Sequence, residues 1–256
     1  MTISNESEFF RDIKKHPNRF YLIHYSCQSL YDQNDGLSPR VTSIAVMHYG
    51  TWQTVSFSTH SIAEELGFSR NDVLENFDEI EMTLLEAFFS FVRERRDKFW
   101  VHWNMRNITY GFEHIEHRYR KLNQKDPPIV PVERRINLND MLSERFGTGY
   151  TEHPKLQHLM EANGGRRRHF LSGPEEVDAF NRCEFIRMHQ STLCKVEFFR
   201  TVIARTIDGR LRINSNSLLY RADRLFDSRL ARAIGACSSA IGVITPLIGL
   251  LIWLFR

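Results

Sequence analysis

The sequence predicts an α/β fold, with a mixed sheet flanked by helices and followed by a single C-terminal transmembrane helix. Short apolar runs with strand character alternate with longer segments whose apolar residues recur at helical spacing. The composition, 42% hydrophobic and 25% charged, is typical of a globular chain. Residues 233–255 carry no charge at all, which sets the end of the chain apart from the rest.

The N-terminal part is expected to supply a short helix and three strands. Ser4 or Asn5 is placed to cap a helix that ends before the first strand. The apolar run at 20–24 is typical of a buried strand, and 41–48 of a second. A turn then leads to 52–57, which alternates as a third strand, so we expect an antiparallel hairpin beside the first strand.

Helices dominate the chain after the hairpin. Phe77, Leu84 and Phe88 share one face of a long amphipathic helix that we expect over 72–96. The remaining strands are expected at 99–102 and 136–138, and the remaining helices at 110–122, after 139, at 154–162 and, as one or two helices, within 174–203.

Charge and cysteine content restrict the class of protein. The net charge is only +3, which excludes a strong global attraction to nucleic acid but leaves room for a local basic patch. Arg166, Arg167 and Arg168 form the densest basic run, suited to phosphates or to anionic lipid head groups. The four cysteines form no C-x-x-C pair, so we expect neither a disulfide framework nor a thiolate zinc site.

The uncharged C-terminal segment predicts a membrane span. As a helix, residues 233–255 would extend roughly 34 Å, enough to cross a hydrocarbon core of about 30 Å. Arginines precede the segment, which by the positive-inside rule leaves the N-terminal domain in the cytoplasm. Gly235, Gly242 and Gly249 repeat at a heptad interval and suit a self-association face between membrane helices.

Several motifs follow the strands in a recognisable order. Val101-His102-Trp103-Asn104 is followed by Gly111-Phe112. After the last strand, residues Lys155 to Leu159 form a Lys-Leu-x-x-Leu pattern. In this order the chain resembles the DEDD-type 3′–5′ exonucleases, which have an RNase H-like fold, over 20–204. Together with the uncharged C-terminal segment, the resemblance predicts an N-terminal helix at 1–19, an exonuclease-like domain at 20–208, a basic connector at 209–232 and a transmembrane helix at 233–255.

The family's chemistry depends on carboxylates that hold a pair of Mg²⁺ ions. Here the first motif places His24 and Ser26 at the carboxylate positions, the second places Thr109 and the third falls near Ser191. Imidazole and hydroxyl groups do not replace hard anionic ligands around Mg²⁺. The resemblance therefore implies the fold and argues against the activity, so we expect no catalytic residues and no cofactor. His102 and Asn104, in the second motif, remain candidate binding residues.

Other constellations leave alternatives open. Asp32, Asp35, Glu113 and Glu116 are candidates for a relocated Mg²⁺ or Mn²⁺ site, or lie on a solvated loop and a solvated helix face. The stretch 62–73 is similar to a helix-turn-helix but overlaps the core spacing of the long helix. His114 and His117 stand at a spacing that zinc uses, or on a solvated helix surface.

The favoured hypothesis is that the chain is a membrane-anchored, catalytically inactive exonuclease-like domain that binds nucleic acid, a nucleotide or a protein partner. A binding domain joined to a membrane segment is the layout of a bacterial stress or antiviral effector, by analogy alone. The enzyme alternative is a membrane-tethered, metal-dependent nuclease with relocated carboxylates. A third possibility is a protein-interaction module with an oligomerising membrane helix.

Overall fold

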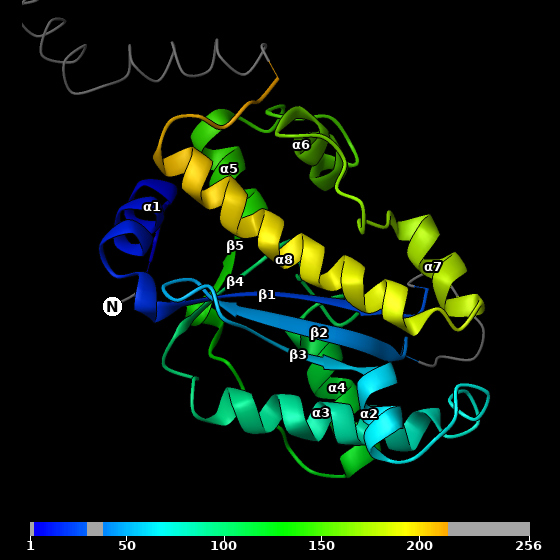
Figure 1. Cartoon of the computed structure of the whole chain (residues 1–256). Coiled ribbons are helices and arrows are strands. Elements are labelled where there is room, and N and C mark those ends of the chain that lie inside the picture. The colour runs from blue at the N-terminus through cyan, green and yellow to red at the C-terminus, as the bar shows by residue number, and fades with distance from the viewer. Residues whose placement is uncertain (1–2, 30–37, 215–256) are drawn as a thin grey trace, which may run out of the picture.

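The structure is a computed structural model that describes residues 3–29 and 38–214. Its centre is a five-stranded mixed sheet with the order β3-β2-β1-β4-β5 (Figure 1). The strands are β1 (Phe20–Cys27), β2 (Val41–His48), β3 (Thr54–Ser58), β4 (Phe99–His102) and β5 (Arg135–Asn137). The described chain is therefore α/β, as the sequence predicts.

β1 is the central strand because both of its faces are apolar. Leu22 joins the core on one face of the sheet, and Ile23 and Tyr25 join the core on the other. β1 pairs antiparallel with β2 and parallel with β4, and β5 continues in parallel beside β4. Parallel strands end at the same edge of a sheet, so residues that follow β1, β4 and β5 gather there.

Helices cover both faces of the sheet (Figure 1). On one face α8 (Phe185–Ile207) packs on β1 and β2; on the other α3 (Phe77–Arg93) packs on β2 and β3 and against α4 (Phe112–Asn123). A hydrophobic core fills the space between the sheet and each helical layer. The other α-helices are α1 (Glu6–Lys15), α2 (Thr59–Glu65), α5 (Leu138–Phe146), α6 (Lys155–Ala162) and α7 (Gly173–Asn181).

Local signals explain several boundaries. Asn5 caps α1, because its Oδ1 accepts from the Glu8 N–H over 2.9 Å, while Ser4 donates its hydroxyl to the Glu8 carboxylate. The predicted segment 174–203 contains two helices. The chain breaks between them at Cys183, whose φ of 56° does not fit a right-handed helix.

The long helix and the third strand begin later in the structure than the sequence predicts. The long helix starts at Phe77 rather than at residue 72, because Asp72 accepts from the backbone N–H and hydroxyl of Ser69 and holds a turn instead. The third strand starts at Thr54 rather than at residue 52, since Trp52 has a φ of 63° and belongs to the turn.

The helix-turn-helix alternative for 62–73 is wrong. α2 was not predicted as a separate element; it ends at Glu65, and Gly67 follows it with a φ of 79°. The next helix begins only at Phe77, so the two helices are not joined by the tight turn of a helix-turn-helix.

Several predictions fall outside the described residues. They concern the membrane span at 233–255, most of the connector before it, the glycine stripe of Gly235, Gly242 and Gly249, and the loop residues Asp32 and Asp35. Within residues 3–29 and 38–214, no helix is long and apolar enough to cross a bilayer.

Candidate functional site

A buried polar cluster lies near the carboxyl end of β1, where the resemblance places the first catalytic motif. Ser26 is 1% exposed, and its hydroxyl donates to Oε1 of Glu176 over 3.0 Å. The same hydroxyl shares a 2.7 Å hydrogen bond with Oγ1 of Thr192. Strand β1 and helices α7 and α8 therefore meet at one serine side chain.

Glu176 is the centre of this cluster. Its Oε1 also accepts from the hydroxyl of Ser191 over 3.0 Å and from Nζ of Lys195 over 2.7 Å. Ser191 and Lys195 are buried, so solvent screens the Glu176–Lys195 ion pair only weakly. Ser26 and Ser191, two of the motif positions, thus donate to the same carboxylate, that of Glu176, which also binds the amine of Lys195.

His24, the other position of the first motif, is buried beside the same cluster. Its Nδ1 lies 3.2 Å from the hydroxyl oxygen of Tyr110, and that hydroxyl donates to the carbonyl of Tyr25 over 3.0 Å. Burial first, and the charge of Lys195 second, hold the pKa of His24 well below its usual range. A neutral His24 whose Nδ1 is hydrogen-bonded in this way is a polar group of the core.

Thr109 does not join the cluster. It lies in an exposed loop, where its N–H donates to Oδ1 of Asn107 over 2.9 Å. The next residue, Tyr110, is the one that reaches the core, and its ring stacks on Tyr25 with centroids 4.5 Å apart. Tyr110, and not Thr109, therefore contacts the core at this end of β1.

Glu113 and Glu116, the two described candidates for a relocated metal site, are paired with arginine. Glu113 and Glu116 both bind Arg135, at 2.6 Å and 2.8 Å, so the prediction of a solvated helix face is wrong for the buried Glu116. In the part of the chain that the structure describes, no group of three or more His, Cys, Asp or Glu side chains is placed to hold a metal ion.

His114 is not a solvated histidine either. It is fully buried, with Nδ1 2.9 Å from the hydroxyl of Tyr25 and Nε2 2.8 Å from the carbonyl of Pro39. Burial lowers its pKa to about 4. Both ring nitrogens are occupied, so neither offers a zinc ion a lone pair, while His117 is exposed on the same helix.

His102 and Asn104 form a separate polar group beyond the ends of β4 and β5. Burial lowers the pKa of His102 to about 3, and its Nδ1 accepts from the Met105 N–H over 3.2 Å. Asn104 has a φ of 54° and its side-chain oxygen accepts from Asn137, Asn139 and Arg106. These bonds occupy the side-chain oxygen of Asn104, and His102 is one of the residues that line a separate hollow of about 350 Å³.

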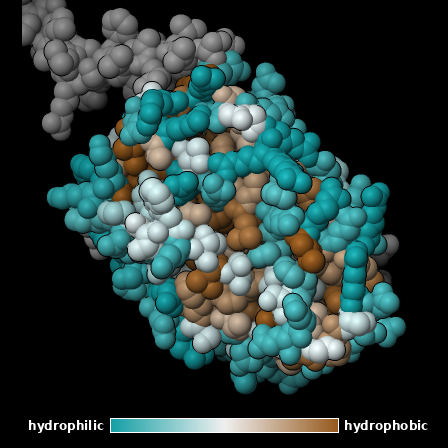
Figure 2. All heavy atoms as spheres, viewed as in Figure 1, coloured by the Kyte–Doolittle hydropathy of each residue, from teal (hydrophilic) through white to brown (hydrophobic). Residues whose placement is uncertain are grey.

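The predicted basic run lies elsewhere, against α8. Two hollows of about 520 and 430 Å³ share Arg167, Arg168, His169 and Gln190 and together form what we call the basic groove. The residues that line this groove include Trp52, Arg166, Arg167, Arg168, His169, Arg187, Gln190 and Arg200. Figure 2 shows the α8 face, where hydrophilic side chains surround hydrophobic ones near its middle and lower part.

The arginines of the groove differ in how far acidic partners neutralise them. Arg166 pairs with Glu175, and Arg167 pairs with Glu197 over 2.9 Å. Arg168 and Arg200 form no ion pair within the described ranges. Positive charge therefore remains available along the groove for an anion.

Trp52 places an aromatic ring at the same groove. It is 64% exposed, and its φ of 63° is unusual for a bulky residue. The guanidinium of Arg200 lies 4.6 Å from the centre of its ring. Backbone strain of this kind persists only where the surroundings enforce it and often marks functional positions.

Comparison with protein-family models, with curated proteins and with solved structures gives no match. The geometry described above therefore carries the functional argument.

Sequence reasoning missed Glu176, Lys195, Trp52 and Arg200. Glu176 and Lys195 lie on two different helices, and no local spacing relates them. Trp52 next to a turn has the pattern of a strand residue. Arg200 lies in an apolar stretch of a helix and belongs to no basic cluster in the sequence. Only the packing of α8 on the sheet brings these residues to the two sites.

Proposed function

We propose that this chain is a membrane-anchored, exonuclease-like domain that no longer uses metal catalysis and that binds nucleic acid through the basic groove. The observation that carries the proposal is Lys195. Its amine sits on Glu176, between the two serines at former carboxylate positions. A positive charge supplied by the protein itself makes this pocket a poor host for a divalent cation.

The sheet supports the family resemblance. Three antiparallel strands are followed by two strands parallel to β1, with helices on both faces, which is in keeping with the RNase H-like order of elements that the motifs imply. Ser26 and Ser191, two of the motif positions, donate to the same oxygen of Glu176, which supports the resemblance, whereas Thr109 lies apart from them.

The groove supports the choice of ligand. Arg168 and Arg200 offer positive charge, and Trp52 offers an exposed ring on which a base can stack. Charged arginines and an aromatic platform in one groove are the combination that binds single-stranded nucleic acid without reading its sequence.

The uncharged segment 233–255 supports the anchor. In this proposal the domain stays in the cytoplasm and the segment crosses the membrane, with the glycine stripe as a contact between copies. Binding of nucleic acid near a membrane would suit a bacterial stress or antiviral effector.

A strand-binding and cleavage assay tests the proposal. The full-length chain, kept soluble in a non-ionic detergent, is mixed with labelled single- and double-stranded DNA and RNA in Mg²⁺, Mn²⁺ or EDTA. We expect a band shift with single strands on native gels and intact strands on denaturing gels. The double variant Arg168→Gln with Arg200→Gln should weaken binding about tenfold or more and lower the salt slope by about 1.4.

Charge-matched variants on α1 provide the control. Arg11→Gln with Lys14→Gln removes the same charge from an exposed helix outside the groove, and binding should change little. Metal-dependent shortening of the strand would overturn the loss of catalysis and restore the nuclease alternative. Absence of any shift would instead favour a protein partner.

A further inference from the structure

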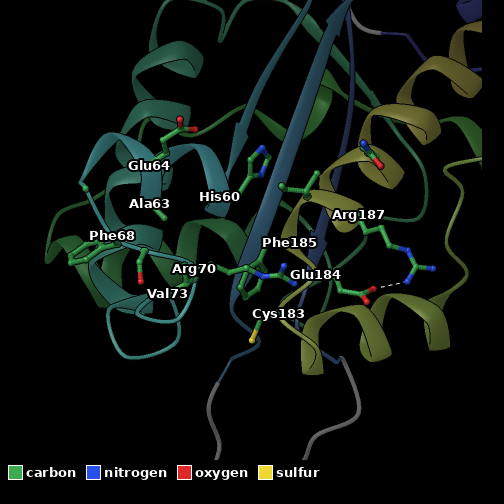
Figure 3. Close-up of a pocket in the computed structure, with 14 residues that line it drawn as sticks. His60, Ala63, Glu64, Phe68, Arg70, Val73, Cys183, Glu184, Phe185 and Arg187 are labelled. Atoms are coloured by element: carbon green, nitrogen blue, oxygen red, sulfur yellow. Dashed lines mark hydrogen bonds and ion pairs between the residues drawn. The ribbon is translucent and has the colours of Figure 1, made fainter.

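A large hollow between α2 and the start of α8 belongs to neither site described above. Its volume is about 700 Å³, within the range of small-molecule pockets. Phe68 and Val73 come from the segment after α2, and Phe185 and Ile186 come from α8 (Figure 3). Ile186 is 57% exposed although it is apolar, so its side chain is available to cover a ligand.

One residue that lines this pocket, His60, carries a ring nitrogen without a partner in the described structure. Nδ1 of His60 is buried and makes no hydrogen bond in the described structure. Burial lowers the pKa of His60, which keeps the ring neutral at pH 7. A buried polar atom without a partner costs free energy, and a ligand that bonds to it would recover that cost.

The pocket opens toward the basic groove. Gln190 lines the pocket and both hollows of the groove, and Arg187 lines the pocket and one of them. Arg187 is held by Glu184 over 2.5 Å (Figure 3). The apolar pocket thus adjoins the arginines of the basic groove. The side-chain amide of Gln190, which can both donate and accept a hydrogen bond, lies at the boundary between them.

We infer that this pocket binds the unstacked base of a nucleotide whose phosphate lies in the basic groove, an inference that rests on the proposed function. The apolar walls accept the faces of a heterocycle, while His60 and Gln190 meet the polar atoms on its edge. The nucleotide is either part of a single strand or free in solution. Duplexes are excluded from the pocket because their bases are stacked and paired.

Fluorescence anisotropy of the full-length chain in non-ionic detergent tests this inference. The probes are a labelled single strand, the same strand made of abasic nucleotides, and free mononucleotides as competitors. We expect the abasic strand to bind about tenfold more weakly, because each stacked base contributes measurably to affinity.

His60→Phe provides the decisive variant. It keeps an aromatic ring beside His189, whose centroid lies 5.2 Å away, and removes the unpartnered nitrogen. We expect about fivefold weaker binding of the normal strand and no change for the abasic strand. His158→Phe is the matched control, since Nδ1 of His158 is also buried without a partner but lies on α6, outside the pocket.

The outcomes separate this inference from the proposed function. If His60→Phe leaves binding of the normal strand unchanged, the base pocket is overturned and the groove stays in place, because bases still stack on Trp52 there. If no strand binds but free nucleotides bind and His60→Phe weakens them, the pocket stands and the strand-binding function falls. If neither strands nor nucleotides bind, both are wrong.

Discussion

Lys195 and Glu176 form an ion pair whose side chains are 7% and 15% exposed, with Ser26 and Ser191 as further donors to the carboxylate. The desolvation of two charges is offset here by their attraction and by the hydroxyl hydrogen bonds. Removing one partner lowers the free energy of unfolding mainly because the other charge is then left without compensation in a largely buried site. The pair therefore helps to hold α7 and α8 against β1.

Lys195→Met tests the pair at the residue scale. The substitution leaves the carboxylate of Glu176 buried without its cation, so we expect the free energy of unfolding to fall by about 3 kcal/mol. The double variant Lys195→Met with Glu176→Gln should recover part of that loss, because it removes the uncompensated charge. Urea denaturation at pH 7 measures both; a single variant as stable as the parent chain would contradict the argument.

The sequence predicted where individual polar residues lie in the fold better than it predicted which residues they bond to. The motif order located Ser26 and Ser191, which meet, and His24, which lies beside them. Their common partner, Glu176, follows a proline and another glutamate at the start of a helix, a pattern typical of any capped helix. Long-range pairing of this kind has no local signature.

Helix α7 links the buried cluster to the basic groove through its first turn. Glu175 accepts from the N–H and hydroxyl of Ser172, at 2.8 Å and 2.7 Å, and also binds Arg166. The Arg166 guanidinium, followed by the Ser172 donors, lowers the pKa of Glu175 to about 2. The same carboxylate therefore anchors the helix start and neutralises an arginine of the groove.

Glu175→Gln should have two opposite effects. Weaker anchoring of the first turn of α7 should lower the free energy of unfolding by about 1 kcal/mol. The release of Arg166 and the loss of a negative charge should raise affinity for a single strand about two- to threefold. Glu197→Gln, which frees Arg167 without touching a helix start, should raise affinity alone. Thermal unfolding and strand titration of both variants check this, and a loss of affinity in either would contradict it.

At the element scale, hydrophobic periodicity predicted most of the fold. The buried strands β1, β2 and β4 and the amphipathic helix α3 appear where apolar spacing placed them. The failures lie at turns. Asp72 and Trp52 adopt local conformations that hydrophobic spacing does not encode, and α2 is a short helix of seven residues with weak spacing of its own.

At the scale of the whole molecule, the described chain ends beside α5 and α6. The N–H of Asn214 donates to the carbonyl of Tyr150 over 2.8 Å, next to the end of α5. Residues 215–232 separate this point from the uncharged segment, and fully extended they would reach roughly 60 Å. Under the proposed function, a connector of this length would let the groove bind a long polyanion beside the membrane.

The anchor makes a prediction for the full chain. We expect it to float with liposomes and to resist alkaline carbonate extraction, because 233–255 is mostly apolar and carries no charged residue. Ile244→Arg with Ile248→Arg should release it, since each arginine near the middle of a span costs about 2.5–3.5 kcal/mol on insertion.

The same charge placed in the connector is the control for release. Leu218→Arg with Leu219→Arg adds two arginines before the span, where they favour the cytoplasmic side, so flotation should persist. Strand binding by the basic groove should be the same in both double variants, because neither touches the described domain. A parent chain that stays out of the liposome fraction, or an Ile244/Ile248 variant that stays with it, would contradict a membrane span at the C-terminus.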